Sequence, residues 1–162
     1  MANELLADVY MGNLEMLKMT LADFSEAEML VRPVPTANHA AWQLGHLAAS
    51  EASMVNACTP GAAAELPAGF ADKFKPETSK IDDPKAFATK AQLLEILAKV
   101  RTASAAWVKT LTPADMAKPG PEQMRKICPT VGHIASLLPS HLAMHLGQFQ
   151  VIRRKLGKAI LF

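Results

Sequence analysis

Hydrophobic residues recur at steps of three and four positions through most of this chain, and that spacing is the period of an amphipathic α-helix. Four long segments carry the pattern, at residues 3–24, 38–58, 90–111 and 131–156. Strong helix formers such as Ala, Leu and Met are abundant, whereas β-branched runs are almost absent. The pattern therefore predicts an all-α protein. In the first segment the repeating positions are Leu6, Val9, Tyr10, Asn13, Leu17, Leu21 and Phe24.

Residues that commonly cap helices stand at the predicted boundaries. Asn38 is suited to be the N-cap of the second helix. Thr89 and Gln92 have the spacing of a capping box at the start of the third helix. Thr130 precedes the fourth helix as a cap, and Gly157 follows it as the glycine that often ends a helix.

Pro139 lies inside the fourth predicted helix, shortly before a pair of histidines. A proline within a helix removes one backbone hydrogen bond and kinks the chain. Proline is also well suited to the first turn of a helix. The sequence therefore allows two interpretations, a kinked helix or a helix that begins afresh near Pro139.

The second and third helices are joined by a long connection, residues 59–89, which contains four prolines. Connections of this length are uncommon and often functional, although some bundles use them as simple crossovers. We expect a crossover and keep a lid as the alternative. Residues 1–162 amount to one domain, so the expected fold is a single four-helix bundle with a long crossover.

Two short motifs recur at a common offset of 87 residues, from position 25 to 112 and from position 45 to 132. Residues 25–29 resemble residues 112–116, and residues 45–48 resemble residues 132–135. Each repeat unit would contain a long helix, a short acidic turn and a second long helix. The repeat predicts two helix pairs related by a pseudo-two-fold axis.

The charge balance gives no sign of a nucleic-acid partner. Seventeen basic residues face 15 acidic ones, and the formal net charge is only +2. The one basic cluster is Arg153-Arg154-Lys155 with Lys158, in the last turns of the fourth predicted helix. Cations there complement the helix dipole, and binding of an anion or a partner is the alternative.

The sequence also bears on the cellular compartment. No apolar run approaches the roughly 20 residues of a membrane span, and the first residues lack the basic and apolar regions of a signal peptide. The two cysteines, Cys58 and Cys128, lie far apart and form no CxxC pair. We therefore expect a cytoplasmic protein with no membrane partner.

Two histidines interrupt the apolar stripe of the fourth helix. His141 and His145 lie one turn apart with Gln148 beyond them, between the apolar Leu138 and Ile152. Because an unpartnered buried polar group costs roughly 1–3 kcal/mol, several together favour a shared partner. A His-x-x-x-His pair can hold one metal ion. The alternative is a pair of core histidines that hydrogen-bond to the backbone or to carboxylates.

His46 on the second helix is the candidate third ligand, if that helix faces the fourth. His133 lies about 12 Å from His141 by helical rise, too far to share the ion. Glu51 lies about 140° around the helix from His46 and is a poor fourth ligand. The sequence contains no Gly-rich phosphate loop, no nucleophile elbow and no zincin glutamate, and no carboxylate base is visible near these histidines.

Two motifs resemble the DinB-like family of helical bundles, which is named for a DNA-damage-inducible protein. The first is Ala-Ala-Trp-Gln-Leu-Gly-His-Leu-Ala at residues 40–48. The second is His-Leu-Ala-Met-His-Leu-Gly-Gln at residues 141–148, followed by Arg-Arg-Lys-Leu-Gly at 153–157. The spacing of the elements between them agrees, so the resemblance covers nearly the whole chain.

The resemblance implies a four-helix bundle with a crossover, in which His46, His141 and His145 hold one divalent metal ion. It also implies a homodimer. Some similar proteins are thiol S-transferases that use bacillithiol, mycothiol or glutathione, but the family alone assigns no reaction. Met144 and Leu146 flank the second histidine where relatives often differ, so the substrate stays open.

Two classes of function follow. The first is a metal-dependent enzyme, either a thiol S-transferase or a hydrolase, because three neutral imidazoles leave an open coordination position. The second is a non-enzymatic, stress-related module that binds a metal or a small ligand. Zinc, nickel and iron all accept imidazole ligands. Trp42, Met144 and Gln148 are expected to line the pocket at the open position, with core packing as the alternative for Trp42 and Met144.

Overall fold

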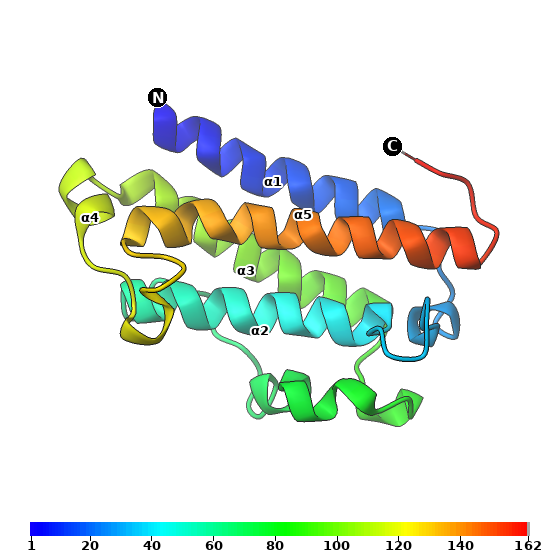
Figure 1. Ribbon diagram of the computed structural model, residues 1–162. Coiled ribbons are helices and arrows are strands. Elements are labelled where there is room, and N and C mark those ends of the chain that lie inside the picture. The colour runs from blue at the N-terminus through cyan, green and yellow to red at the C-terminus, as the bar shows by residue number, and fades with distance from the viewer. Residues whose placement is uncertain (162) are drawn as a thin grey trace.

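The computed structural model describes residues 1–161, which form a bundle of four long helices (Figure 1). Within this range there is no β-strand, so the all-α four-helix bundle is confirmed. The long helices are α1 (Ala2–Leu21), α2 (Ala40–Cys58), α3 (Lys90–Thr110) and α5 (Val131–Lys155). The connections contain the short α4 (Pro113–Ala117) and the 3-10 turns η1 (Glu28–Leu30), η2 (Ala71–Phe74), η3 (Pro76–Lys80), η4 (Pro84–Ala86) and η5 (Glu122–Met124).

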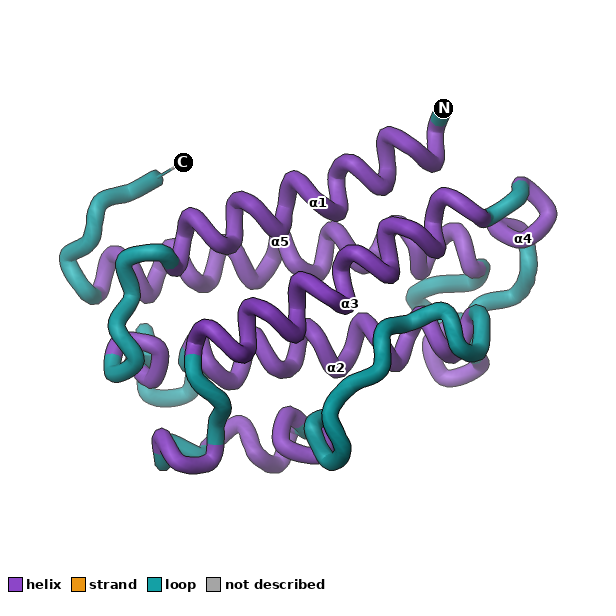
Figure 2. The backbone as a smooth tube through the Cα atoms, turned by 180° about the vertical axis from the view of Figure 1, so that it is seen from behind, coloured by secondary structure: helices purple, strands orange, loops and turns teal. Residues whose placement is uncertain are grey.

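Each of α1 and α2 packs against both α3 and α5, so α1 and α2 occupy opposite corners of the bundle. The connection between α2 and α3 crosses the outside of α2, and η2 packs on that helix (Figure 2). This is the expected crossover. Among the described helices, none is both long enough and apolar enough to pass through a membrane.

The N-cap of α2 differs from the prediction. His39, rather than Asn38, caps the helix, because its Nδ1 accepts a hydrogen bond from the Trp42 backbone N–H at 3.1 Å. The His39 ring is held in place by a contact of 3.0 Å between its Nε2 and the Ile81 carbonyl oxygen of the crossover. The carbonyl oxygen of Asn38 instead accepts a hydrogen bond from the Gln43 side chain.

The other predicted helix ends agree more closely with the structure. The Thr89–Gln92 capping box is present, and Gly157 ends α5 with a positive φ of 69°. Thr130 is the N-cap residue of α5, but its hydroxyl contacts the His133 ring at 2.8 Å and caps no backbone N–H. α1 ends three residues earlier than predicted, and Phe24 is buried in the turn that follows.

α5 runs through Pro139 as one helix and does not begin afresh there. Because Pro139 has no N–H, the carbonyl oxygen of Ala135 loses its partner within the helix. The Tyr10 hydroxyl of α1 donates a hydrogen bond to that oxygen at 2.7 Å, and Asn13 donates to the Pro139 carbonyl at 2.9 Å. Burial raises the pKa of Tyr10, which keeps its hydroxyl protonated as a donor.

The two repeat units share a hydrogen-bonding pattern after their first long helix, although η1 is a 3-10 turn and α4 is an α-helix. Ser25 and Glu28 exchange side-chain-to-backbone hydrogen bonds after α1, and Thr112 and Asp115 form the equivalent capping box after α3. The offset of 87 residues also places the start of α1 on the start of α3. The structure therefore agrees with two similar helix pairs.

Most cations of the basic cluster at the end of α5 form hydrogen bonds or ion pairs with other parts of the same chain. Arg153 is buried and pairs with Asp23. Lys155 donates to the backbone of residues 32–33, and Lys158 donates to the Asp23 carbonyl. Arg154 is exposed and, unlike the other three, forms no side-chain hydrogen bond or ion pair within residues 1–161.

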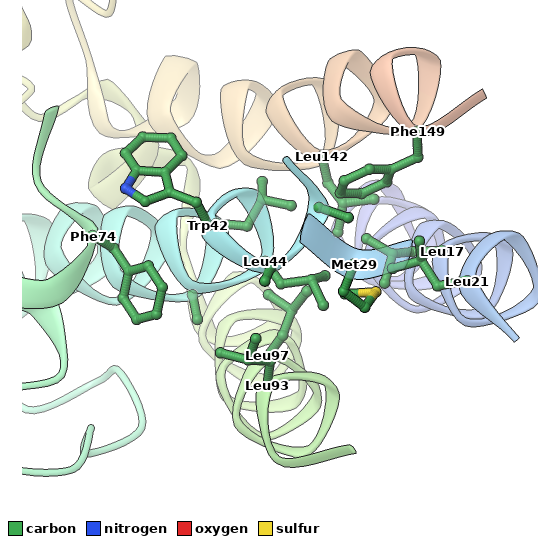
Figure 3. Packing of buried hydrophobic residues seen from close by; sticks show 14 of the residues in the cluster. Leu17, Leu21, Met29, Trp42, Leu44, Phe74, Leu93, Leu97, Leu142 and Phe149 are labelled. Carbon is green, nitrogen blue, oxygen red and sulfur yellow. The ribbon is translucent and has the colours of Figure 1, made fainter. Parts of the chain in front are cut away.

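The buried apolar residues form two clusters along the bundle, and a polar layer separates them. The larger cluster contains the side chains of Leu44, Leu93, Leu97, Leu142 and Phe149 (Figure 3). The second cluster lies beyond it and includes Ala7, Val55, Val108, Ile134 and Leu138.

Arg101 and Glu51 form the centre of this polar layer. Both side chains are almost completely buried, and their charged atoms lie 2.6 Å apart. Arg101 also donates to the Tyr10 carbonyl, and its guanidinium lies 4.4 Å from the centre of the Tyr10 ring. Burial raises the pKa of Glu51, and the Arg101 charge opposes this rise.

Arg101→Met should lower the free energy of unfolding by about 3–5 kcal/mol, because it leaves the Glu51 carboxylate buried without a cation. The double variant Arg101→Met/Glu51→Leu should recover most of that loss. Lys99→Met is the control, since it breaks an exposed pair with Glu95 and should change stability by less than about 0.5 kcal/mol. Urea unfolding measures all three, and a double variant no more stable than Arg101→Met would contradict this account.

Candidate metal centre

Three histidines from two helices converge on one point in the bundle. His46 comes from α2, and His141 and His145 come from consecutive turns of α5. One ring nitrogen of each lies within 4.8 Å of the others, which is an arrangement that could hold a metal ion. The Nε2 atoms of His141 and His145 are 3.2 Å apart. The predicted condition, that the second helix faces the fourth at His46, is met.

The crossover holds His46 from behind. The His46 ring stacks on the Trp42 ring, with the two ring centres 4.9 Å apart and the planes nearly parallel. The Trp42 Nε1–H donates a hydrogen bond to the Thr78 hydroxyl at 3.0 Å, which links this stack to the crossover. Phe74 packs against the bare backbone of Gly45, where an added Cβ would lie only 2.1 Å from the Phe74 ring. Glycine is required at this position for the crossover to approach α2 so closely.

Gln43 fixes the protonation of His145. The Gln43 Nε2–H donates to the Asn38 carbonyl oxygen at 2.7 Å, so its Oε1 must be the atom that faces His145. That oxygen lies 2.6 Å from the His145 Nδ1 and can only accept, which places the ring proton on Nδ1. The lone pair of Nε2 is therefore free and points at His141. Metal-binding histidines are commonly oriented in this way by a second residue.

The environment keeps all three rings neutral. Burial lowers the pKa of His46 and of His141, and it lowers the pKa of His145 to about 3. Charge repulsion from a protonated His46 also lowers the pKa of His141, and repulsion from His141 and His46 lowers the pKa of His145. Neutral imidazoles are the form that binds metal ions.

The donor set fits a divalent ion. A tetrahedral zinc site with bonds of about 2.0–2.1 Å places its nitrogen atoms about 3.3 Å apart. The pair on α5 already has this separation at 3.2 Å, and the whole set lies within 4.8 Å. Without an ion, the Nε2–H of His141 can donate to the His145 Nε2, but this single proton cannot also satisfy the His46 nitrogen that converges on the pair. The chemistry of the donors therefore favours a metal ion over a purely structural histidine cluster.

A cavity of about 420 Å³ opens directly beside the histidines. His46 and His141 form part of its wall, whereas His145 is buried behind them. Its other lining residues are Ser50, Ser53, Met54, Ala57, Gln123, Met124 and Leu137, from α2, η5 and α5. A small molecule in this cavity would meet the exposed side of the histidine cluster.

The residues expected to line a pocket have other positions in the structure. Trp42 is buried behind His46, with 4% of its surface exposed, and supports that ring. Met144 is 59% exposed and Gln148 is exposed, and neither lines the cavity beside the histidines. His133 lies outside the histidine cluster, and Glu51 pairs with Arg101, so both are absent from the donor set as expected.

Gln43 was missed by the sequence analysis, although a signal was present. It lies between Ala40 and Leu47 in the apolar pattern of α2, at a position that the helical period predicts to be buried. A buried amide needs partners for both its oxygen and its nitrogen. The polar residue at this position could therefore have been assigned a role beside the histidines.

The comparison with protein families was decisive for classification. The sequence profile described as the DinB superfamily matches residues 12–149, which include all three histidines. The chain belongs to the DinB superfamily. No curated protein matches the chain at a significant level. The DinB assignment supports the bundle and the histidine cluster, and it leaves the reaction undetermined.

The purified protein should carry close to one divalent ion per chain, measured by elemental analysis. His46→Ala, His141→Ala and His145→Ala should each lose most of that ion, because two imidazoles hold it far more weakly than three. Gln43→Met should lower the metal affinity about 10–100-fold by releasing His145. His133→Ala is the control and should keep the ion. The assignment is wrong if His133→Ala loses the metal while His141→Ala retains it.

Proposed function

We propose that this DinB-superfamily protein is a metal-dependent thiol S-transferase. The observation that carries the proposal is the set of three neutral imidazoles, two of which form part of the wall of a cavity that contains no carboxylate. When bound, a divalent ion such as zinc, nickel or iron would supply the positive charge that deprotonates a thiol without a protein base. The thiolate would attack an electrophilic carbon, forming a C–S bond as the leaving group departs with its electron pair. The thiol proton passes to solvent.

The protein itself orients the histidine rings and limits the direction from which a substrate can reach them. Gln43 fixes the His145 ring, and Trp42 fixes the His46 ring, so the donors are oriented before any ligand arrives. The crossover closes the rear of the site through Phe74. A substrate therefore reaches the histidines from the cavity side.

Hydrolysis is the second candidate reaction, since an ion in this site would also activate water. It is less well supported because the nine residues that line the cavity include no carboxylate that could act as a general base. The buried Glu51 is already paired with Arg101. A binding module without turnover is the third candidate. We also propose a cytoplasmic location, which agrees with the free state of Cys58 and Cys128.

Cobalt substitution tests the thiol proposal directly. Titration of a small neutral thiol, 2-mercaptoethanol, into the cobalt-loaded protein should raise an intense near-ultraviolet charge-transfer band, because the thiolate binds the ion; glutathione is titrated in parallel. His46→Ala should show no such band, whereas His133→Ala should respond like the wild type. If no thiol changes the spectrum of the loaded protein, S-transfer is excluded, and hydrolysis or simple ligand binding becomes the better account.

We further propose a homodimer that is formed by α1 and α5. α1 presents the exposed apolar side chains of Leu5, Val9 and Met19. Gly12 in α1 and Gly147 in α5 lie inside helices, where glycine costs roughly 0.5–1 kcal/mol relative to alanine. An added Cβ at either glycine would meet nothing within 4 Å, so the fold of one chain does not require them. Close approach of a helix from a second protomer would explain why glycine occupies both positions.

Charge complementarity selects a second copy of this chain as the partner. α1 and α5 run in the same direction, so Asp8 lies at one end of this face and Arg154 at the other (Figure 1). Both are exposed, and neither forms an ion pair within the described residues. A two-fold axis through the middle of this α1–α5 face would bring Asp8 of each protomer to Arg154 of the other protomer.

Light scattering at micromolar concentration should give the mass of a dimer, and Gly147→Leu should give a monomer because its side chain blocks the approach. Asp8→Arg should weaken the dimer, and adding Arg154→Asp should restore it. Thr102→Leu, on the exposed side of α3, is the control and should stay dimeric. A wild-type protein that is monomeric under these conditions refutes the dimer.

A further inference from the structure

The cavity beside the histidines differs from four other cavities of the protein in the absence of charged side chains from its wall. None of its nine lining residues is Lys, Arg, Asp or Glu. Four other cavities of similar size on the described part of the chain each contain at least two such residues. Charged side chains make up 20% of the sequence, so their absence from this wall is a distinguishing feature of the site.

The wall nearest the histidines is polar but uncharged. Ser50 and Ser53 follow His46 at steps of four and three residues, so they continue its stripe along α2. The Ser50 hydroxyl donates to the His46 carbonyl oxygen at 2.6 Å, so towards the cavity it can only accept. Gln123 adds an amide, which can donate and accept. These groups suit hydroxyl or amide groups of a ligand.

The remaining wall is apolar and well fixed. Met54, Met124 and Leu137 line it. The Met124 carbonyl oxygen accepts hydrogen bonds from the backbone of Ile127 and of Cys128, which holds the η5 turn in place. Across the base of this loop, the Gly120 N–H donates to the Pro129 carbonyl oxygen and the Val131 N–H donates to the Lys118 carbonyl oxygen. The loop therefore presents a stable apolar surface opposite α2.

The nearest buried cation gives no compensation for a charged ligand. This cation is Arg101 of α3, which donates a hydrogen bond to the Leu138 carbonyl oxygen, three residues before His141 in α5. Its side chain is fully buried, however, and its charge is matched by Glu51 at 2.6 Å. A charged group on the far end of a ligand would therefore lose water and gain no counter-ion.

We infer that the site takes small molecules that are electrically neutral apart from the donor atom at the histidines, with a hydroxyl-bearing or apolar far end. This inference rests on the proposed function, because the donor atom in that proposal is the sulfur of a thiol. It sets the substrate class: thiols with a carboxylate or an ammonium far from the sulfur are poor ligands, and neutral thiols are good ones.

Rigid para-substituted benzenethiols test this selectivity, because their far group cannot fold back onto the ion. The cobalt-loaded protein is titrated with 4-mercaptobenzyl alcohol, 4-mercaptobenzoate and 4-(aminomethyl)benzenethiol, and the visible cobalt bands report binding. The neutral alcohol should bind at least tenfold more tightly than either charged thiol. Equal affinity for the alcohol and the carboxylate would overturn the inference.

Two variants in the η5 loop distinguish the effect of the cavity wall on selectivity from the general effect of an added positive charge. Met124→Lys puts a cation into the wall and should improve the binding of 4-mercaptobenzoate at least tenfold relative to the alcohol. Ile127→Lys is the matched control in the same loop, where the side chain is 74% exposed, and should leave the ratio unchanged. If both variants change the ratio equally, the cavity wall does not set the selectivity.

The test also distinguishes this inference from the proposed function. If no thiol changes the cobalt bands, the same comparison is made with 4-(imidazol-1-yl)benzyl alcohol and 4-(imidazol-1-yl)benzoate, which offer a nitrogen donor. A tenfold preference for the alcohol would then support the neutral cavity while the thiol proposal fails. Equal binding of these two imidazoles would overturn the inference as well.

Discussion

The carbonyl oxygen of Ala135 has no partner in its own helix, because Pro139 offers no N–H. The Tyr10 hydroxyl of α1 satisfies it, and the backbone carbonyl of Tyr10 is in turn held by Arg101 of α3. Arg101 pairs with Glu51, which lies on α2 five residues after His46. One connected set of buried polar contacts thus joins all four long helices. It links the α5 turn just before His141 to the helix that carries the remaining histidine.

This layer gives the bundle a defined register. Apolar side chains alone tolerate small shifts of one helix along another, whereas a buried ion pair and its hydrogen bonds are lost when a helix moves. Three nitrogen atoms must converge to bind one ion, so the site requires such a register. The crossover adds a second constraint from outside, since Trp42 and Phe74 hold the α2 side of the cluster.

Much of this arrangement could be predicted from sequence periodicity. The helical period located the four helices, and the placement of His141 and His145 on an apolar stripe indicated buried donors with a common partner. The partners of those donors were harder to predict. Gln43, Arg101 and Glu51 each lie on an apolar stripe, but the period shows only that they are buried and not which residue they face.

Long-range contacts explain where the structure differs from the expected cap of α2 and from the expected position of Trp42. The cap of α2 depends on the Ile81 carbonyl, which orients the His39 ring from more than 40 residues away along the chain. The position of Trp42 likewise depends on Thr78 of the crossover. Capping and pocket residues were judged from neighbours in sequence, and in both cases a distant segment determined the result.

One part of the cavity wall comes from a segment of the chain that carries none of the three histidines. All three histidines lie on α2 and α5, whereas Gln123 and Met124 belong to the short η5 loop, whose backbone hydrogen bonds close within residues 118–131. Substitutions in that loop can reshape the wall without moving a donor atom. Related bundles could therefore diverge in the molecules they accept through this loop alone. For a protein engineer, exchanging residues 119–130 between such bundles is the most economical route to a changed ligand preference.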